Sequence, residues 1–198
     1  MIRLFLAVAA FATAFSAVAD ETPRRDVPAD TQENFEKHIK PLLAEIGKLS
    51  SIVIYEGLPH QRKEKELLAR ELKDKKTVKL HGFPFFEEVI RVNTEDAAKL
   101  SALCGDLKTF DRYSGAKFCD GFHPDWCVEF KNGPEVYRVL ICFGCREARL
   151  YGPMNDVYAN LTQESHDIFV NVLTPLWKNR VGKEPTAPRP LGGSSKPG

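Results

Sequence analysis

A β-hairpin pattern in the second half of the chain constrains the fold more than any other feature. Segments 126–130 and 136–143 are rich in β-branched and aromatic residues and lie on either side of the turn sequence Lys-Asn-Gly-Pro, which predicts two antiparallel strands. Because Pro134 has no amide hydrogen, we expect a four-residue loop that pairs Phe130 with Glu135 instead of a tight two-residue turn. Every second side chain then lies on one core-facing side of the hairpin. These side chains are Trp126, Val128, Phe130, Tyr137, Val139, Ile141 and Phe143.

Helical and strand-like patterns alternate through the rest of the chain. Helix caps and apolar periodicity predict helices over residues 30–49, 62–75, 94–103 and 169–177. Short β-branched or aromatic runs predict strands at 51–55 and in two pieces of 77–92. This mixed order favours an α+β domain: an antiparallel sheet of about four to five strands, with the hairpin at its centre and three to four helices packed on one face.

The N-terminal residues indicate export. Residues 1–19 have a positively charged start at Arg3, an apolar stretch too short to span a membrane, and small residues at a cleavage site, as in a secretory signal peptide. Residues 20–29 and 181–198 are low in apolar residues and rich in Pro, Gly or charged residues, which predicts a disordered linker and a disordered tail. We therefore expect one folded domain over residues 30–180, periplasmic or secreted, with no membrane segment after signal cleavage.

The charge balance argues against several classes of partner. Once Arg3 is removed with the signal peptide, the basic residues equal the 27 acidic residues in number. A chain without net charge gives no reason to expect nucleic acid or an anionic membrane surface as partner. The sequence contains no phosphate loop, dinucleotide fingerprint or zincin motif. We expect a monomer that binds a protein or a small molecule.

Ser165-His166-Asp167 contains the three residue types of a hydrolase triad. Adjacent helical positions point about 100° apart, so they cannot form the chain of nucleophile, base and orienting carboxylate. We therefore expect a solvated helix face at these residues, and we identify no catalytic residue in the sequence.

Five cysteines follow the signal peptide, so in an oxidising compartment at least one thiol lacks a disulfide partner within the chain. Extending the expected hairpin register places Cys142 opposite His123 and Cys145 near residue 120, with Cys119 beside both. We expect a structural disulfide from Cys119 to either Cys142 or Cys145. Closing a loop of this size typically stabilises a small exported domain by about 2–4 kcal/mol.

The same cysteines allow other interpretations. Cys119, His123, Cys142 and Cys145 together offer three thiolates and one imidazole, a set suited to tetrahedral zinc. Cys142 and Cys145 also have the spacing of a redox pair, although redox thiols usually precede a helix and here the chain continues as Arg-Glu-Ala-Arg-Leu-Tyr. Covalent haem attachment requires a histidine directly after the second cysteine, where this chain has Arg146.

A short segment resembles part of a haem protein. Residues 35–45 are similar to the segment that opens some planctomycete-type c-type cytochrome domains, in which a Cys-x-x-Cys-His motif follows shortly. Here the sequence Ile-Gly-Lys-Leu-Ser-Ser follows instead, at residues 46–51. The resemblance covers these few residues and lacks the haem-binding chemistry, so it implies neither haem nor a function.

Three histidines stand beside glycine or proline in predicted loops at strand ends. Loops on one edge of a sheet bring such residues together, so His60, His81 and His123 form a candidate pocket with Trp126. The simpler alternative is that each histidine caps a turn or packs on an aromatic ring. Our main prediction is an exported, disulfide-stabilised domain without a cofactor, in a binding or envelope-accessory role. A zinc-binding protein or zinc enzyme is the alternative, and a thiol–disulfide redox protein comes third.

Overall fold

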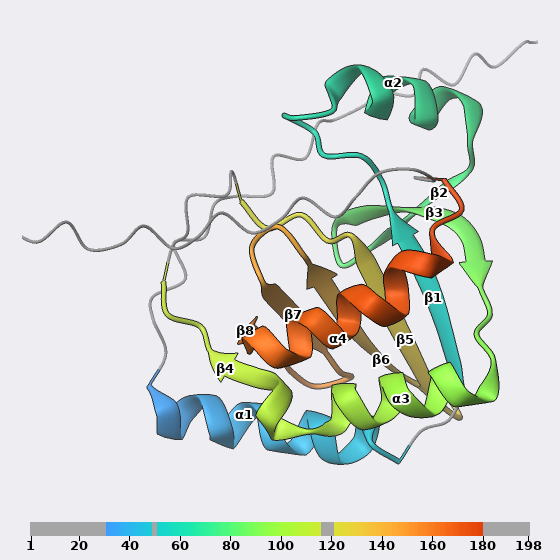
Figure 1. Ribbon diagram of the computed structural model, residues 1–198. Helices are drawn as coiled ribbons and strands as arrows, with labels where there is room; N and C mark the ends of the chain where they lie inside the picture. Colours follow the sequence, from blue (N-terminus) through green and yellow to red (C-terminus); the bar gives the residue numbers. More distant parts are fainter. Residues whose placement is uncertain (1–30, 49–50, 116–120, 180–198) are drawn as a thin grey trace, which may run out of the picture.

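The computed structural model describes residues 31–48, 51–115 and 121–179 (Figure 1). The expected signal peptide (1–19), linker (20–29) and tail (181–198) lie outside these residues. In the part of the chain that is described, no helix is long and apolar enough to cross a membrane. The helices are α1 (Gln32–Ile46), α2 (Lys65–Asp74), α3 (Thr94–Gly105) and α4 (Gln163–Leu173), with short 3-10 helices η1 (Leu107–Thr109) and η2 (Thr174–Leu176). The strands are β1 (Ile52–Gly57), β2 (Thr77–Leu80), β3 (Phe83–Ile90), β4 (Phe110–Arg112), β5 (Trp126–Asn132), β6 (Glu135–Cys142), β7 (Glu147–Tyr151) and β8 (Asp156–Leu161).

The strands form one antiparallel sheet in the order β2-β3-β1-β5-β6-β7-β8-β4. The expectation of an α+β sheet of four to five strands is therefore wrong, because the fold is a sheet-dominated, curled half-barrel of eight strands. The sequence-based prediction does not include β4, β7 or β8. β7 and β8 place Ala148 and Ala159 on their apolar side, where β-branched residues would mark a strand more clearly.

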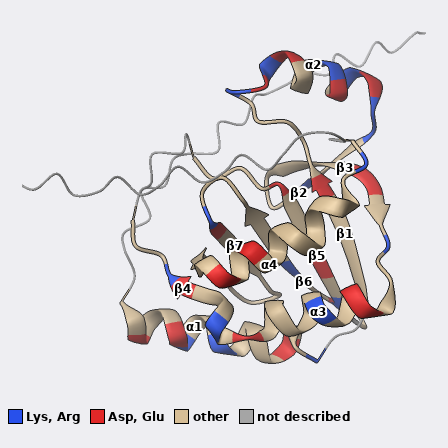
Figure 2. Cartoon of the chain, viewed as in Figure 1, with Lys and Arg blue, Asp and Glu red and all other residues tan. Residues whose placement is uncertain are grey.

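The helices also depart from the expected layer on one face. α1, α3 and α4 cover one face of the sheet, whereas α2 lies apart from them, beyond the ends of the strands (Figure 1). α2 is dense in charged residues (Figure 2) and contributes no side chain to either buried apolar cluster. α1 continues unbroken through Pro41 and packs its apolar side against the sheet. Its buried residues are Phe35, Ile39, Leu42, Leu43 and Ile46.

The expected hairpin is present as β5 and β6, but in a different register. Phe130 pairs with Tyr137, two residues away from the partner that a four-residue loop requires. Gly133 and Pro134 form a two-residue turn: Gly133 supplies a positive φ of 57°, and Pro134 occupies the second turn position, whose amide the strand ladder does not need. A shift of two residues keeps every side chain on its face. The core-facing set predicted for the hairpin is therefore buried against the helices.

α1 and α3 approach each other closely where Gly47 meets Gly105. A Cβ atom added to Gly105 would lie 2.7 Å from the Cα atom of Gly47, closer than side chains tolerate. Glycine at these positions lets the two helix ends touch through their backbones. The contact closes the helical layer over the apolar face of the sheet.

Candidate ligand site on the arginine face of the sheet

Contacts between distant strands show how strongly the sheet curls. The ring centres of Phe83 on β3 and Tyr158 on β8 lie 5.5 Å and 4.6 Å from the guanidinium carbon of Arg149 on β7. β3 and β8 are five strand positions apart in the sheet order, which corresponds to about 24 Å in a flat sheet. The sheet therefore wraps around the side on which Arg149 lies. We call this side the arginine face, and the opposite side, covered by α1, α3 and α4, the helix face.

The strand registers determine which side chains share the arginine face. One row crosses the sheet as Tyr55, Cys127, Leu140, Arg149 and Tyr158. The row beside it contains Val53, Glu129, Arg138, Tyr151 and Asp156, and a shorter third row contains Cys142, Glu147 and Asn160. Charged positions thus occur within the central strands themselves (Figure 2). The same face contains a small buried apolar cluster of Leu80, Phe83, Phe85, Cys127 and Leu140.

Arg149 lies among three aromatic rings. Besides Phe83 and Tyr158, the ring centre of Phe122 lies 5.1 Å from the guanidinium carbon. The Nε atom of Arg149 is buried without a hydrogen-bond partner, and no Asp or Glu among the described residues forms an ion pair with this side chain. Burial raises the pKa of the nearby Tyr151 hydroxyl, and Arg149 opposes that rise. The ring faces attract the cation, but no described carboxylate neutralises it.

The carboxylate of Glu147, two residues before Arg149, is engaged elsewhere. Glu147 is 1% exposed, and the Tyr158 hydroxyl donates a hydrogen bond to its Oε2 atom over 2.5 Å. Burial raises the pKa of Tyr158, and the negative charge of Glu147 raises it further, so the hydroxyl keeps its proton and remains a donor. The ring of Tyr113 stacks on that of Tyr158 with 4.2 Å between centroids. This stacking restrains the Tyr158 ring beside Arg149.

A second polar group occupies the neighbouring row. Arg138 donates through Nε to the Oε2 atom of Glu129, which is 2% exposed, over 2.8 Å. The Nη1 atom of Arg138 lies 3.2 Å from Nε2 of His81, and because a guanidinium only donates, His81 accepts here as a neutral imidazole. Burial and then the charge of Arg138 lower the pKa of His81. The His81 ring stacks on Tyr151 at 3.7 Å.

The structure brings together two of the four residues of the predicted pocket. The ring centroids of His60 and His123 lie 4.8 Å apart. The Nδ1 atom of His60 accepts hydrogen bonds from two backbone amides of the following turn, so His60 caps a turn. His81 belongs instead to the Arg138 group. Trp126 is fully buried on the helix face.

The predicted cysteine cluster lies partly outside the described residues, because residues 116–120 include Cys119. Cys142 carries a free, buried thiol. Burial raises the pKa of this thiol to about 12, although backbone hydrogen bonds from His123 and Cys145 oppose the rise. A thiol with such a pKa remains protonated at neutral pH.

Cys145 differs from the other described cysteines. The free cysteines of the described residues are Cys104, Cys127 and Cys142, and Cys145 is not among them. Its Sγ atom lies 3.9 Å from the carbonyl oxygen of Gly121, next to the segment that contains Cys119. Within the described ranges, no group of three or more His, Cys, Asp or Glu residues is arranged to hold a metal ion.

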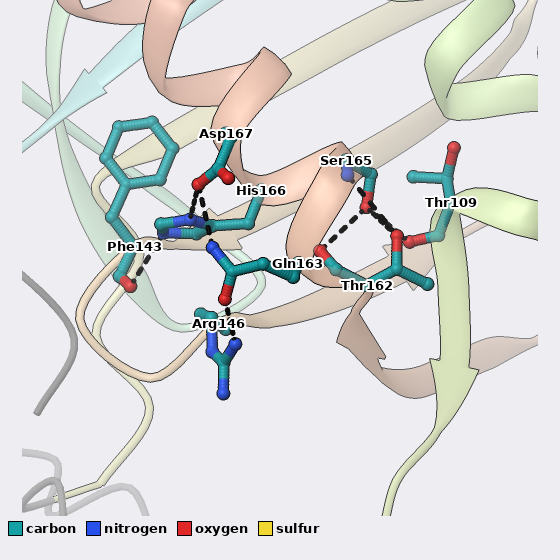
Figure 3. Close-up of polar contacts among 8 residues, drawn as sticks. All are labelled: Thr109, Phe143, Arg146, Thr162, Gln163, Ser165, His166 and Asp167. Atoms are coloured by element: carbon teal, nitrogen blue, oxygen red, sulfur yellow. Dashed lines mark hydrogen bonds and ion pairs between the residues drawn. The ribbon is translucent and has the colours of Figure 1, made fainter. Parts of the chain in front are cut away.

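Ser165, His166 and Asp167 do not form a triad (Figure 3). Ser165 and His166 are 3% and 4% exposed, so the prediction of a solvated face is wrong for these two residues. Ser165 Oγ donates to the carbonyl oxygen of Thr109 over 2.8 Å, and His166 Nε2 lies 3.2 Å from the carbonyl oxygen of Phe143. These contacts attach the start of α4 to η1 and to the β6–β7 turn.

The sequence-based prediction missed Arg149, the central residue of the arginine face. Its signal is the alternation of Glu147, Arg149 and Tyr151 with Ala148 and Leu150, since a period of two marks a strand with one polar side. Comparison of the chain with protein-family models, with curated proteins and with solved structures finds no match. The chemistry of the chain's own residues is therefore the basis for a functional proposal.

Proposed function

We propose that this protein is an exported binding protein that takes a small molecule on the arginine face. The observation that carries the proposal is the convergence of aromatic rings around Arg149. The apolar cluster on this side of the sheet contains no residue from a described helix. The ring of Phe122 lies 5.3 Å from that of Phe83 and 5.7 Å from that of Tyr158, and Tyr113 stacks on Tyr158. Small-molecule sites combine such aromatic walls with a few polar groups.

The polar groups of this face favour a ligand over a second hydrophobic core. The helix face of the central strands is mostly apolar, as a core requires, and its buried Glu56 accepts hydrogen bonds from the backbone amides of Lys178 and Asn179. The arginine face instead carries Arg138 and Arg149 together with the buried carboxylates of Glu129 and Glu147. Burying charged groups costs free energy unless they are paired. Contacts with aromatic rings orient Arg149, and because no described carboxylate pairs with it, its charge is available to a ligand.

In this proposal a disulfide joins Cys119 to Cys145. The free thiol of Cys142 removes it as a partner, and Cys145 lies beside Gly121, close in sequence to Cys119. A bridge of this kind closes a loop between the segment before β5 and the β6–β7 turn, and it would stabilise the domain by about 3 kcal/mol. It would also restrain Phe122 over Arg149. The signal-peptide features of residues 1–19 support the oxidising compartment that the bridge needs.

The zinc and redox alternatives both require Cys142 as a thiolate. Its raised pKa of about 12 disfavours that form at neutral pH. A binding or envelope-accessory role makes no such demand on Cys142, so we retain it as the proposal and assign no catalytic step.

Ligand-observed NMR tests the proposed binding. The full chain is expressed, recovered after export under oxidising conditions, and mixed with neutral aromatic compounds (indole, benzyl alcohol) and with carboxylic acids (phenylacetate, indole-3-acetate). We expect saturation transfer to at least one probe, and a marked weakening in Phe122→Ala because an aromatic wall is removed. The control Met154→Ala changes a side chain that is 93% exposed and should leave the transfer unaltered. Absence of transfer to every probe, or equal transfer in Phe122→Ala, would contradict the proposal.

A further inference from the structure

Arg149 has no counter-ion among the residues that the structure describes. Its Nε atom is enclosed and has no hydrogen-bond partner, and the Arg149 side chain as a whole is only partly buried. The ring centres of Phe83, Phe122 and Tyr158 lie 5.5, 5.1 and 4.6 Å from the guanidinium carbon and restrict its orientation. The positive charge of Arg149, the orientation of its guanidinium and the apolar rings around it are thus in place before a ligand binds.

We infer that Arg149 binds the carboxylate of a small organic acid whose apolar body lies against Phe83 and Phe122. The inference rests on the proposed binding function and names the chemical class of its ligand. A planar guanidinium donates two parallel hydrogen bonds to a carboxylate, and a single carboxylate neutralises a single arginine. The rings of Phe83 and Phe122 stand edge to face at 74° and form an apolar wall beside the guanidinium.

The internal carboxylate of Glu147 does not take the ligand's place. Glu147 and Arg149 lie on the same side of β7, yet no ion pair joins them among the described residues. The Tyr158 hydroxyl holds the Glu147 carboxylate through a hydrogen bond of 2.5 Å. Tyr158 therefore engages the carboxylate with its hydroxyl and presents its ring to Arg149.

A phosphate or sulfate group fits this site less well than a carboxylate. The other arginine of the face, Arg138, is already bonded to Glu129 and lies against His81. Among the described residues, Arg149 is then the one arginine of this face available to the ligand. Its single positive charge neutralises a monoanion but only half of the charge of a dianion.

Matched pairs of an acid and its amide test the charge of the ligand. Phenylacetate with phenylacetamide, indole-3-acetate with its amide, and hexanoate with hexanamide are titrated into the full-length, oxidised protein by calorimetry at fixed ionic strength. Each pair keeps the apolar body and removes only the negative charge. We expect at least one acid to bind about ten-fold more tightly than its amide, because the charge-assisted hydrogen bonds are lost in the amide.

Variants of Arg149 test whether this residue causes the preference for an acid over its amide. Arg149→Met should abolish it, and Arg149→Lys should retain part of it because the charge remains while the planar fork is lost. The matched control Arg91→Met, an exposed arginine after β3, should leave the preference unchanged. If Arg149→Met does not fold, NMR of arginine-labelled wild-type protein replaces it: the terminal nitrogen signals of Arg149 should shift with the acid and not with the amide.

The outcomes separate the inference from the function on which it rests. Equal affinities for acid and amide, or a preference that survives Arg149→Met, would overturn the carboxylate assignment while the binding function stands. Arg149 signals that do not respond to a bound acid would do the same. If neither acids nor amides bind, the inference and the proposed function fail together.

Discussion

The Tyr158 hydroxyl donates a hydrogen bond to Glu147, and no carboxylate of the described residues forms an ion pair with Arg149. Glu147 precedes Arg149 by two residues on β7, so both side chains lie on the same face. Tyr158 engages Glu147, and the neighbours of the guanidinium are aromatic rings. The proposed site therefore depends on Tyr158 in two ways, through its hydroxyl and through its ring.

Tyr158→Phe removes the donor and leaves the buried Glu147 carboxylate short of one hydrogen bond. We expect a loss of about 1.5–3 kcal/mol in the free energy of unfolding, the usual contribution of a hydrogen bond to a charged group. Urea unfolding measures it. Tyr55→Phe is the matched control, since Tyr55 lies in the same row of the arginine face and its hydroxyl forms no hydrogen bond within the described residues. A loss no larger than that of the control would contradict the role of this contact.

Alkaline pH provides a second test of Tyr158. Burial and Glu147 raise the pKa of this group above the ordinary value of 10.0, so the unfolded chain loses this proton before the folded protein does. Its contribution to stability is present below pH 10 and decreases as the pH rises further, by about 1.4 kcal/mol per pH unit. Urea unfolding at several pH values should show a shallower decline in Tyr158→Phe. Identical slopes in the two proteins would argue against a raised pKa.

Arg138→Met removes the guanidinium from Glu129 and from His81. We expect a loss of about 3 kcal/mol in stability, at the lower end for a broken buried pair, because Lys131 still pairs with Glu129. Adding Glu129→Gln should recover part of this loss. Arg138→Met should also raise the pKa of His81, since the charge of Arg138 is one cause of its lowered value. NMR titration measures that pKa, and an unchanged value would rule out the contact.

Gly105→Ala tests the close approach of α1 and α3. The added methyl group meets the backbone of Gly47 at 2.7 Å, so we expect a loss of about 1–3 kcal/mol from overpacking, although alanine is the better helix former. Gly144→Ala is the control, because an added Cβ there has no atom within 4 Å. Thermal unfolding compares the two variants. Equal melting temperatures would show that the helix ends are free to separate.

Thiol alkylation followed by mass spectrometry tests the cysteine assignment. In the native protein Cys104, Cys127 and Cys142 should not react at neutral pH, because burial raises the pKa of each thiol, that of Cys142 to about 12. After denaturation without a reductant all three should react. Cys119 and Cys145 should react only after reduction. Labelling of Cys145 without a reductant would contradict the proposed disulfide, and labelling of native Cys142 would reopen the zinc and redox alternatives.

The sequence pattern predicts the faces of the hairpin but not its register. Alternation has a period of two, so pairing Phe130 with Glu135 or with Tyr137 buries the same side chains. The turn decides between them, and the interpretation of Pro134 as an obstacle is wrong because the amide that it lacks lies outside the strand ladder. The same error shifts the partners expected for the cysteines beyond the end of β6.

By itself, the sequence determined the helix-forming segments, the hairpin and its buried side, because these follow from local periodicity and turn residues. Only the tertiary structure decided the arginine face. Phe83, Phe122 and Arg149 come from three separate segments and meet because the eight-stranded sheet curls. The curl results from the accumulated twist of all its strands and from packing between strands that are not neighbours, and no local sequence pattern contains that information.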